Sequence, residues 1–249
     1  PSGEPTGQPS GQPSGQPTSA PSGFCNLDPI PLGNASSFVV LGYASISNSG
    51  NTVLGGNLGL WPGTTSSESF TYVGGEEHVN DYMAEAALRD MGVAFLTARN
   101  VRAPTPELWP VSSGQGLMHD TTLTCGIYKV EGDLYISGTV YLDGNENPDS
   151  VFIIQVSGNI YTAPDSEIVL TGRASVLNVF WQTEGKAYLG SYSFFTGTIL
   201  SFCRIIADEG VDGRLFADNR YMIDTVMNLN LFNAMVHTAY PTSMPTIGV

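Results

Sequence analysis

The sequence predicts a turn-rich, all-β fold that carries one long helix and is flanked by extended arms. The chain of 249 residues has 29 glycines and only 13% charged residues, a composition that favours short strands joined by tight turns. Short runs of Val, Ile, Phe and Tyr recur between turn residues, and one proline-free segment is rich in Ala, Leu, Met and Glu. Apolar residues make up 41% of the chain, which is enough to fill a sizeable core.

The first 23 residues form a tetrapeptide repeat that reads PSGE, PTGQ, PSGQ, PSGQ, PTSA and PSG. Proline at every fourth position and the near absence of apolar side chains predict an extended arm with polyproline II character. Ser or Thr follows every proline, which is typical of O-glycosylated stalks, although a plain flexible linker has the same composition. The candidate O-glycosylation sites are Ser2, Thr6, Ser10, Ser14, Thr18 and Ser22.

Residues 241–249, PTSMPTIGV, begin a second repeat of the same period. Thr242 and Thr246 are the matching O-glycosylation candidates. A folded domain, residues 24–240, therefore lies between two stretches of one repeat, an arrangement typical of tandem or fibrous surface proteins.

Strands are expected wherever four to six β-branched and aromatic residues stand between turn residues. Glycine one or two residues before many of these runs fits tight corners. The expected strands are residues 38–41, 126–130, 133–136, 151–156, 167–170, 178–182 and 197–200.

One long helix, about residues 77–99, is expected in the segment EEHVNDYMAEAALRDMGVAFLTARN. Apolar positions at helical spacing predict a face that packs on the strands, and Pro104 and Pro106 end the helix. The apolar positions are Met83, Ala87, Met91 and Ala94.

Three stretches carry a resemblance to a known family. The first is LGNASSFVVL, which begins at residue 32, with SISNSG from residue 45. The second is LTCGIYK, from residue 123. The third consists of NVFWQ, FTGTIL and VDGRLFA, between residues 178 and 217. In order and spacing they resemble the ice-binding-protein-like family, over about residues 30–232. The resemblance implies a discontinuous parallel β-solenoid of roughly triangular section, with the helix against one face and the handedness left open.

Family members that bind ice are thought to use a flat face of outward Thr, Ser and Ala. The matching places here read Ile160-Tyr161-Thr162, Ala187-Tyr188-Leu189, Arg204-Ile205-Ile206 and Tyr221-Met222-Ile223. Tyrosine at positions where a flat ice-binding face needs small residues favours a protein or glycan contact face over an ice surface. The simpler alternative is that half-buried strands favour aromatics. The expected contact residues are Tyr135, Tyr141, Tyr161, Tyr188 and Tyr221.

The leading functional hypothesis is a non-enzymatic, extracellular structural module of a glycosylated fibril, cell-surface appendage or matrix. Its expected partners are copies of itself, joined through repeat arms and solenoid faces, and glycans. The alternative is an ice-binding protein that uses a flat solenoid face, with ice as the partner. A carbohydrate-binding or carbohydrate-active solenoid is a minor alternative.

Charge and residue types argue against other functions. The net charge is −14 and nine basic residues are scattered singly, so nucleic acid is not an expected partner. No apolar run is long enough for a membrane span. His78, His119 and His237 are far apart in sequence and near no nucleophile motif, so neither catalytic residues nor a cofactor are expected.

Three cysteines allow one disulfide and one free thiol, or three buried thiols. The disulfide candidate joins Cys25 to Cys125. Asn34-Ala35-Ser36 is the single N-glycosylation sequon, and a lone sequon is weak evidence because it recurs by chance. The repeats at both ends favour a secreted or cell-surface protein.

A weak calcium candidate consists of Asp143, Asn145, Asn147 and Asp149, which alternate as in the first half of an EF-hand loop. Pro148 and Ile154 stand where that loop needs glycine and glutamate. A polar turn between two strands fits this segment better, and no metal is expected.

Overall fold

The computed structural model describes residues 27–48, 52–66, 70–101, 107–108, 115–207, 211–217, 228–231 and 235–237. Both repeat stretches lie outside these ranges, together with their O-glycosylation candidates, and so do Cys25 and Tyr221. The expectations for these residues stay predictions.

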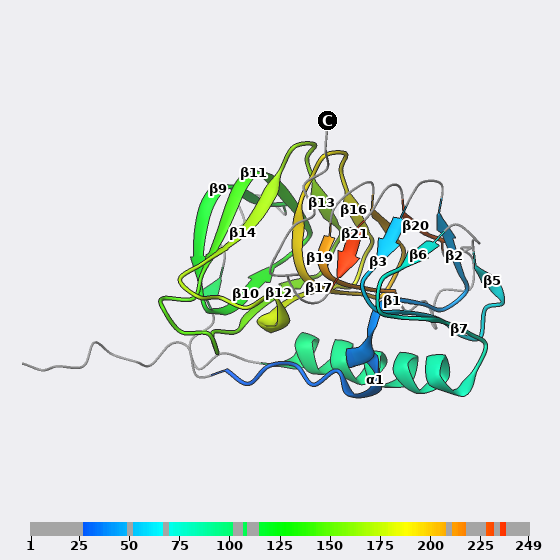
Figure 1. Ribbon diagram of the computed structural model, residues 1–249. Coiled ribbons are helices and arrows are strands. Elements are labelled where there is room, and N and C mark those ends of the chain that lie inside the picture. Colours follow the sequence, from blue (N-terminus) through cyan, green and yellow to red (C-terminus); the bar gives the residue numbers. More distant parts are fainter. Residues whose placement is uncertain are drawn as a thin grey trace, which may run out of the picture.

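The described chain is built of short strands, one long helix and two 3-10 turns (Figure 1). The helical elements are η1 (Gly33–Ser37), α1 (Tyr82–Asn100) and η2 (Val176–Asn178). The strands before and just after α1 are β1 (Phe38–Gly42), β2 (Ser45–Asn48), β3 (Thr52–Leu54), β4 (Asn57–Leu60), β5 (Thr65–Ser66), β6 (Phe70–Tyr72), β7 (Glu77–Val79), β8 (Glu107–Leu108), β9 (Gln115–Thr124), β10 (Gly126–Val130) and β11 (Asp133–Asp143). The remaining strands are β12 (Phe152–Val156), β13 (Ile160–Thr162), β14 (Glu167–Thr171), β15 (Val179–Thr183), β16 (Ala187–Leu189), β17 (Phe195–Ser201), β18 (Ile205–Ala207), β19 (Val211–Ala217), β20 (Asn228–Leu231) and β21 (Met235–His237).

The strands stack in parallel and wind into a β-solenoid with three faces. The first face, in stacking order, is β7-β4-β1-β19-β17-β15-β12-β10-β8. The second face is β5-β2-β20-β18-β16-β13 followed by the first halves of β11 and β9. Because β1 pairs with β19, the N-terminal coils stack on coils from the far end of the sequence, as expected for a discontinuous solenoid. The predicted fold class is confirmed.

The third face is built by β6, β3, β21 and the start of β19 at one end, and by β14 with the second halves of β11 and β9 at the other. Long strands reach it by turning a corner. β11 changes partner from β13 to β14 at Gly138, whose φ is +62°. Gly213, in β19, has a φ of +146°, and a Cβ there would collide with the backbone of Gly197. Only glycine fits that corner.

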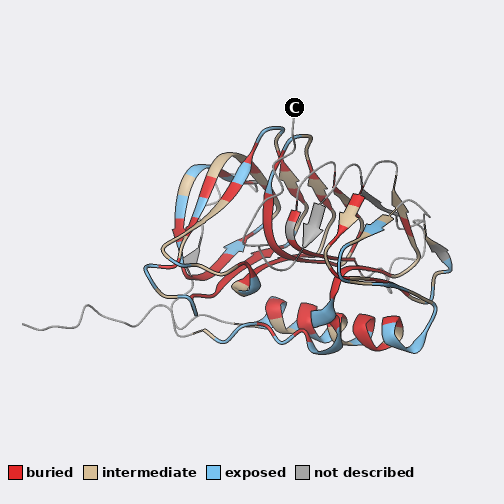
Figure 2. Ribbon diagram, viewed as in Figure 1, coloured by how far each residue is buried: buried red, intermediate tan, exposed pale blue. Residues whose placement is uncertain are grey.

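The solenoid interior is a continuous apolar core. Residues such as Val40, Ile154, Trp181 and Leu215 are fully or almost fully buried in it. The indole Nε1–H of Trp181 donates to the Thr196 carbonyl at 2.9 Å, so even this polar group is satisfied. Figure 2 shows the buried residues concentrated along the strands that line this interior.

Helix α1 lies along the first face and forms a second apolar layer with it (Figure 2). Ala87, Met91 and Ala94 are buried against residues such as Phe180 and Phe216. The predicted core stripe is therefore correct at three of its four positions, because Met83 remains 43% exposed. Residues 27–37 run beside the helix (Figure 1).

The helix begins five residues later than the sequence predicts. Asp81 is the N-cap, and its side chain accepts a hydrogen bond from the Ala84 amide at 2.8 Å. The preceding residues Glu77–Val79 form β7, which pairs with β4. Within the described residues, no helix is both long and apolar enough to cross a membrane.

Candidate functional site

The second solenoid face carries a row of outward side chains in strict register. Strand pairing aligns Leu117, Tyr135, Tyr161, Tyr188 and Ile206 across β9, β11, β13, β16 and β18. Their neighbours along each strand are buried, so the alternation of a parallel strand directs this row outward. We call these five residues the outward row and the face that carries them the ladder face.

The three tyrosines of the outward row stack on one another. The ring centroids of Tyr135 and Tyr161 are 4.9 Å apart with planes at 12°, and those of Tyr161 and Tyr188 are 5.0 Å apart at 1°. Adjacent strands lie about 4.8 Å apart, so identical side chains in register meet face to face. Burial and the nearby Asp133, Tyr188 and Tyr135 raise the pKa of Tyr161. The hydroxyl of Tyr161 therefore stays neutral beyond its ordinary range.

The five expected contact tyrosines do not share one face. Tyr141 lies beyond the Gly138 corner, in the half of β11 that pairs with β14, and is 40% exposed on the third face. Tyr221 lies outside the described residues. The strand that continues the ladder face after β18 is β20, further along the chain.

The stacking limits which parts of the rings a partner could contact. Each ring covers the face of its neighbour, so Tyr161 has both faces occupied and presents mainly its edge and hydroxyl. The ladder is thus a strip of ring edges, not a set of free aromatic platforms.

One outward position was predicted one residue too early. The resemblance places Ile205 at the centre of its coil, but Ile205 is buried and Ile206 aligns with Tyr188. Leu117, which is 58% exposed at the end of the outward row, was not among the expected contact residues. The pattern Gly116-Leu117-Met118-His119, with Met118 buried, is the alternation that could have identified it.

A hydrogen-bonded corner fixes the edge of the ladder face. Asn159 donates to Asp133 Oδ1 through its backbone amide at 2.7 Å and its side chain at 3.0 Å. The Lys186 amide donates to Asn159 Oδ1 at 2.9 Å. These bonds join three successive coils just before Tyr135, Tyr161 and Tyr188, so the tyrosines rest on a rigid edge.

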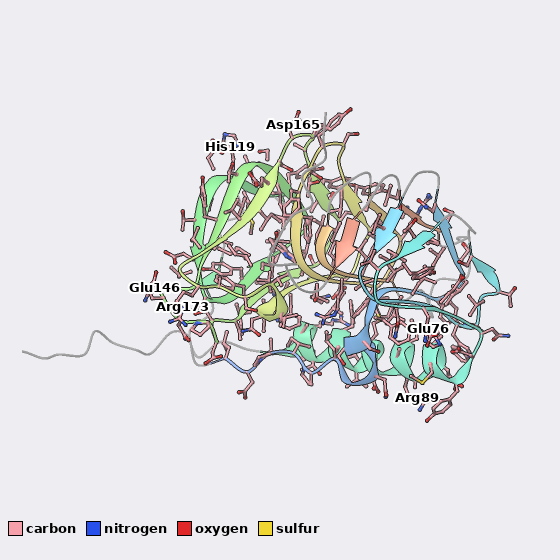
Figure 3. All side chains as sticks on the ribbon, in the orientation of Figure 1. Glu76, Arg89, His119, Glu146, Asp165 and Arg173 are labelled. Carbon is pink, nitrogen blue, oxygen red and sulfur yellow. The ribbon has the colours of Figure 1, made fainter. Side chains whose placement is uncertain are left out.

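The weak calcium candidate is a polar turn in the structure. Asp143 Oδ1 accepts from the Asn145 amide at 2.9 Å, and Asn147 Oδ1 accepts from the Asp149 amide at 3.0 Å. Figure 3 shows Glu146 of this turn near Arg173 at one edge of the molecule. Among the described residues, no group of three or more His, Cys, Asp and Glu side chains could hold a metal ion.

Two of the described histidines have local partners. His78 Nδ1 lies 2.8 Å from Asp81 Oδ2 at the start of α1. His119 Nδ1 lies 3.0 Å from Ser137 Oγ, and Figure 3 labels His119 at the outer edge of the molecule. Both contacts fix the local structure.

The cysteine and sequon candidates are partly described. Cys125 is disulfide-bonded, whereas Cys203 is a buried free thiol whose pKa is raised by burial. The expected partner, Cys25, lies outside the described residues, so that pairing stays a prediction. Asn34 of the sequon is exposed, and its side-chain amide donates to Asp90 Oδ2 at 2.7 Å.

Comparison with known proteins identifies relatives of this chain. A family model described as Ice-binding-like matches residues 40–227. A protein of Colwellia sp. named Ice-binding protein is 34% identical over 205 residues, which are 76% of this chain and 78% of that protein. The crystal structure of an ice-binding protein from an Antarctic Biological Consortium has a TM-score of 0.77 and 30% identity, covering 85% of this chain and 91% of that one. The crystal structure of an ice-binding protein from the Antarctic ascomycete Antarctomyces psychrotrophicus has a TM-score of 0.76 and 27% identity, covering 85% of this chain and 99% of that one.

These findings correct the leading functional hypothesis. The relatives compared are named for ice binding, so the hypothesis of a structural fibril module is wrong. The expectations of a non-enzymatic protein and of the family resemblance are confirmed. With its helix-backed parallel solenoid and a match that spans most of the folded region, the chain belongs to the ice-binding-like family.

Proposed function

We propose that this protein binds ice through the ladder face. The proposal rests on the family membership and on relatives named as ice-binding proteins that cover about three quarters of the chain or more. Ice is an extended solid surface, so a protein that binds it needs a rigid, level array of groups instead of a pocket.

Burial and charge favour the ladder face over the other two faces. Helix α1 covers the first face. The third face carries the ionisable side chains of Glu167 and Asp143 beside Tyr141. Charged side chains hold their own hydration shells and would interrupt an ordered water layer. On the ladder face the outward row, from Leu117 to Ile206, has no charged member. The nearby carboxylate of Asp133 lies at the edge of the face, where it accepts hydrogen bonds from Asn159.

The stacked tyrosines are compatible with a level surface. A single large ring would hold an ice lattice away from its smaller neighbours. Three rings in register on successive coils instead form one strip of even height, flanked by Leu117 on one side and by Ile206 on the other. Beyond Ile206 the register continues to Asn230 of β20 and Ser47 of β2. Hydroxyl groups repeat along this strip at the spacing of the coils, beside apolar ring edges.

Freezing-point measurements test the proposal. In a nanolitre osmometer the purified protein is expected to hold small ice crystals at a constant size below their melting point and to facet them. Fluorescently labelled protein is expected to enter a growing ice hemisphere. If folded protein shows neither effect at millimolar concentration, the proposal fails.

We also propose that the protein acts outside the cell. The disulfide at Cys125 supports this location, because disulfides persist in oxidising compartments. Thiol counting under denaturing, non-reducing conditions is expected to find one free thiol, Cys203. Sugars on the repeat arms stay a prediction that mass spectrometry of the arm peptides can test.

A further inference from the structure

A polar pocket of about 300 Å³ lies where the end of α1 passes over β10, β12 and β15. Its lining includes Arg99 and Asn100 of the helix segment, Lys129, Gln155, Gln182 and Glu184. This volume is at the lower end of the range for small-molecule sites. The pocket belongs to the helix-covered face, so it is separate from the ladder face.

Two glutamines in register give the pocket an unmet hydrogen-bond donor. Gln155 and Gln182 are paired neighbours on β12 and β15. Gln155 Nε2 donates to the carbonyls of Ala98 at 2.7 Å and Val101 at 3.0 Å, so it completes the end of the helix. Gln182 is only 2% exposed, and its Nε2 has no hydrogen-bond partner among the described residues.

Buried side-chain amides are almost always hydrogen-bonded, so the Gln182 donor requires an explanation. Gln182 lines the pocket, although its Nε2 atom is itself buried. Its last torsion is broad, so a rotation of the amide group presents the N–H to the pocket. A ligand with an acceptor atom would satisfy it there.

The charges around the pocket favour an uncharged ligand. Arg99 Nε lies 2.9 Å from Glu184 Oε1, and Lys129 Nζ lies 3.1 Å from Glu131 Oε1. Each pair is neutral as a whole. Arg99, Lys129 and Glu184 line the pocket, whereas Glu131 lies outside the lining and neutralises Lys129 from there. With both cations paired, neither an anion nor a cation finds an uncompensated charge of opposite sign.

A hydroxyl group fits the remaining chemistry, because it accepts and donates at once. Gln182 Nε2 needs an acceptor, and the Glu184 carboxylate has lone pairs beyond the one that faces Arg99. Neighbouring hydroxyls on one molecule can serve both groups. We propose that this pocket binds a small uncharged polyol, with Gln182 donating to one hydroxyl and Glu184 accepting from the next.

An NMR titration tests the proposal with three six-carbon probes. Sorbitol carries neighbouring hydroxyls, 1,6-hexanediol lacks them, and gluconate adds a carboxylate. Sorbitol is expected to shift the Gln182 side-chain amide signals in a saturable way and to bind at least tenfold more tightly than either of the other probes. Equal binding of sorbitol and hexanediol, or tighter binding of gluconate, would contradict the proposal.

Two variants separate binding from folding. Gln182→Met keeps the volume and removes the unmet donor, so its Tm is expected to stay equal or rise while sorbitol affinity falls at least tenfold. Glu184→Gln is expected to bind gluconate more tightly than the wild type, because the repelling carboxylate is gone. Unchanged sorbitol affinity in Gln182→Met would overturn the proposal. Since both variants leave the ladder face intact, their ice activity is expected to match the wild type.

Discussion

At the scale of single residues, the stacked tyrosines show that the contribution of one side chain to stability depends on how many rings it contacts. Tyr161 contacts two rings, whereas Tyr135 and Tyr188 each stack on one ring of the ladder. An aromatic pair contributes about 0.5–1.5 kcal/mol beyond its buried area. The middle ring therefore accounts for twice the stacking energy of either end.

This difference predicts an ordered series of alanine variants. Tyr161→Ala is expected to lower the free energy of unfolding by about 1–3 kcal/mol, and Tyr188→Ala by about half as much. Urea denaturation followed by circular dichroism measures both. Equal losses in the two variants would mean that the rings do not stack in solution.

A second residue-scale feature is the buried hydroxyl of Tyr72 in β6. It has no hydrogen-bond partner among the described residues, and burial, with a further contribution from Glu77, raises its pKa strongly. The unfolded chain ionises this group near pH 10, but the folded chain does so only at higher pH. The stability that depends on the neutral hydroxyl is complete below about pH 10 and is lost as the pH rises further.

Tyr72→Phe is therefore expected to match or exceed the wild type in stability at about pH 8 and to lose less stability at about pH 11. Urea midpoints at the two pH values test this. If the variant loses as much stability as the wild type on going to alkaline pH, Tyr72 is not the group responsible.

At the scale of elements, the corners decide which strand joins which face. The glycine at position 213 allows β19 to turn from one face to the next while its backbone lies against Gly197. Gly74 also has a positive φ, +89°, but a Cβ there would meet nothing within 4 Å. A substitution at Gly74 would therefore cause backbone strain alone, whereas a substitution at Gly213 would add a steric collision.

Gly213→Ala is accordingly expected to cost more than about 3 kcal/mol, whereas Gly74→Ala should cost about 1–2 kcal/mol from its backbone conformation alone. Thermal unfolding of both variants checks the difference. Similar costs would show that the close approach of Gly213 and Gly197 does not constrain the corner.

At the same scale, the sequence predicted several of the strands but not where a long strand turns a corner or where the helix begins. Runs such as residues 151–156 and 178–182 identified strands because β-branched and aromatic residues are concentrated there. The Gly138 corner was not visible in the sequence, so Tyr141 was grouped with tyrosines on another face. The helix start was misplaced because Glu77–Val79 pair with β4, a tertiary contact that local propensity does not encode.

At the scale of the whole molecule, the parallel stacking of coils aligns single outward residues into an extended surface. Successive coils place an outward side chain at the same level of the ladder face, and strict register aligns these residues into a row. The resemblance predicted that Tyr161 and Tyr188 point outward, but their stacking depends on distances between coils that the sequence does not give. A hypothesis based on residue types alone therefore favoured a contact face, whereas the relatives are named for ice binding.

The most direct test of this account is the thermal hysteresis of Tyr161→Lys compared with Tyr141→Lys. Both variants replace an outward tyrosine by a charged side chain of similar length, one on the ladder face and one on the third face. With both folds verified by circular dichroism, Tyr161→Lys is expected to lose most of the freezing hysteresis and Tyr141→Lys to keep the wild-type value. Full activity in Tyr161→Lys, or a loss confined to Tyr141→Lys, would contradict binding of ice through the ladder face.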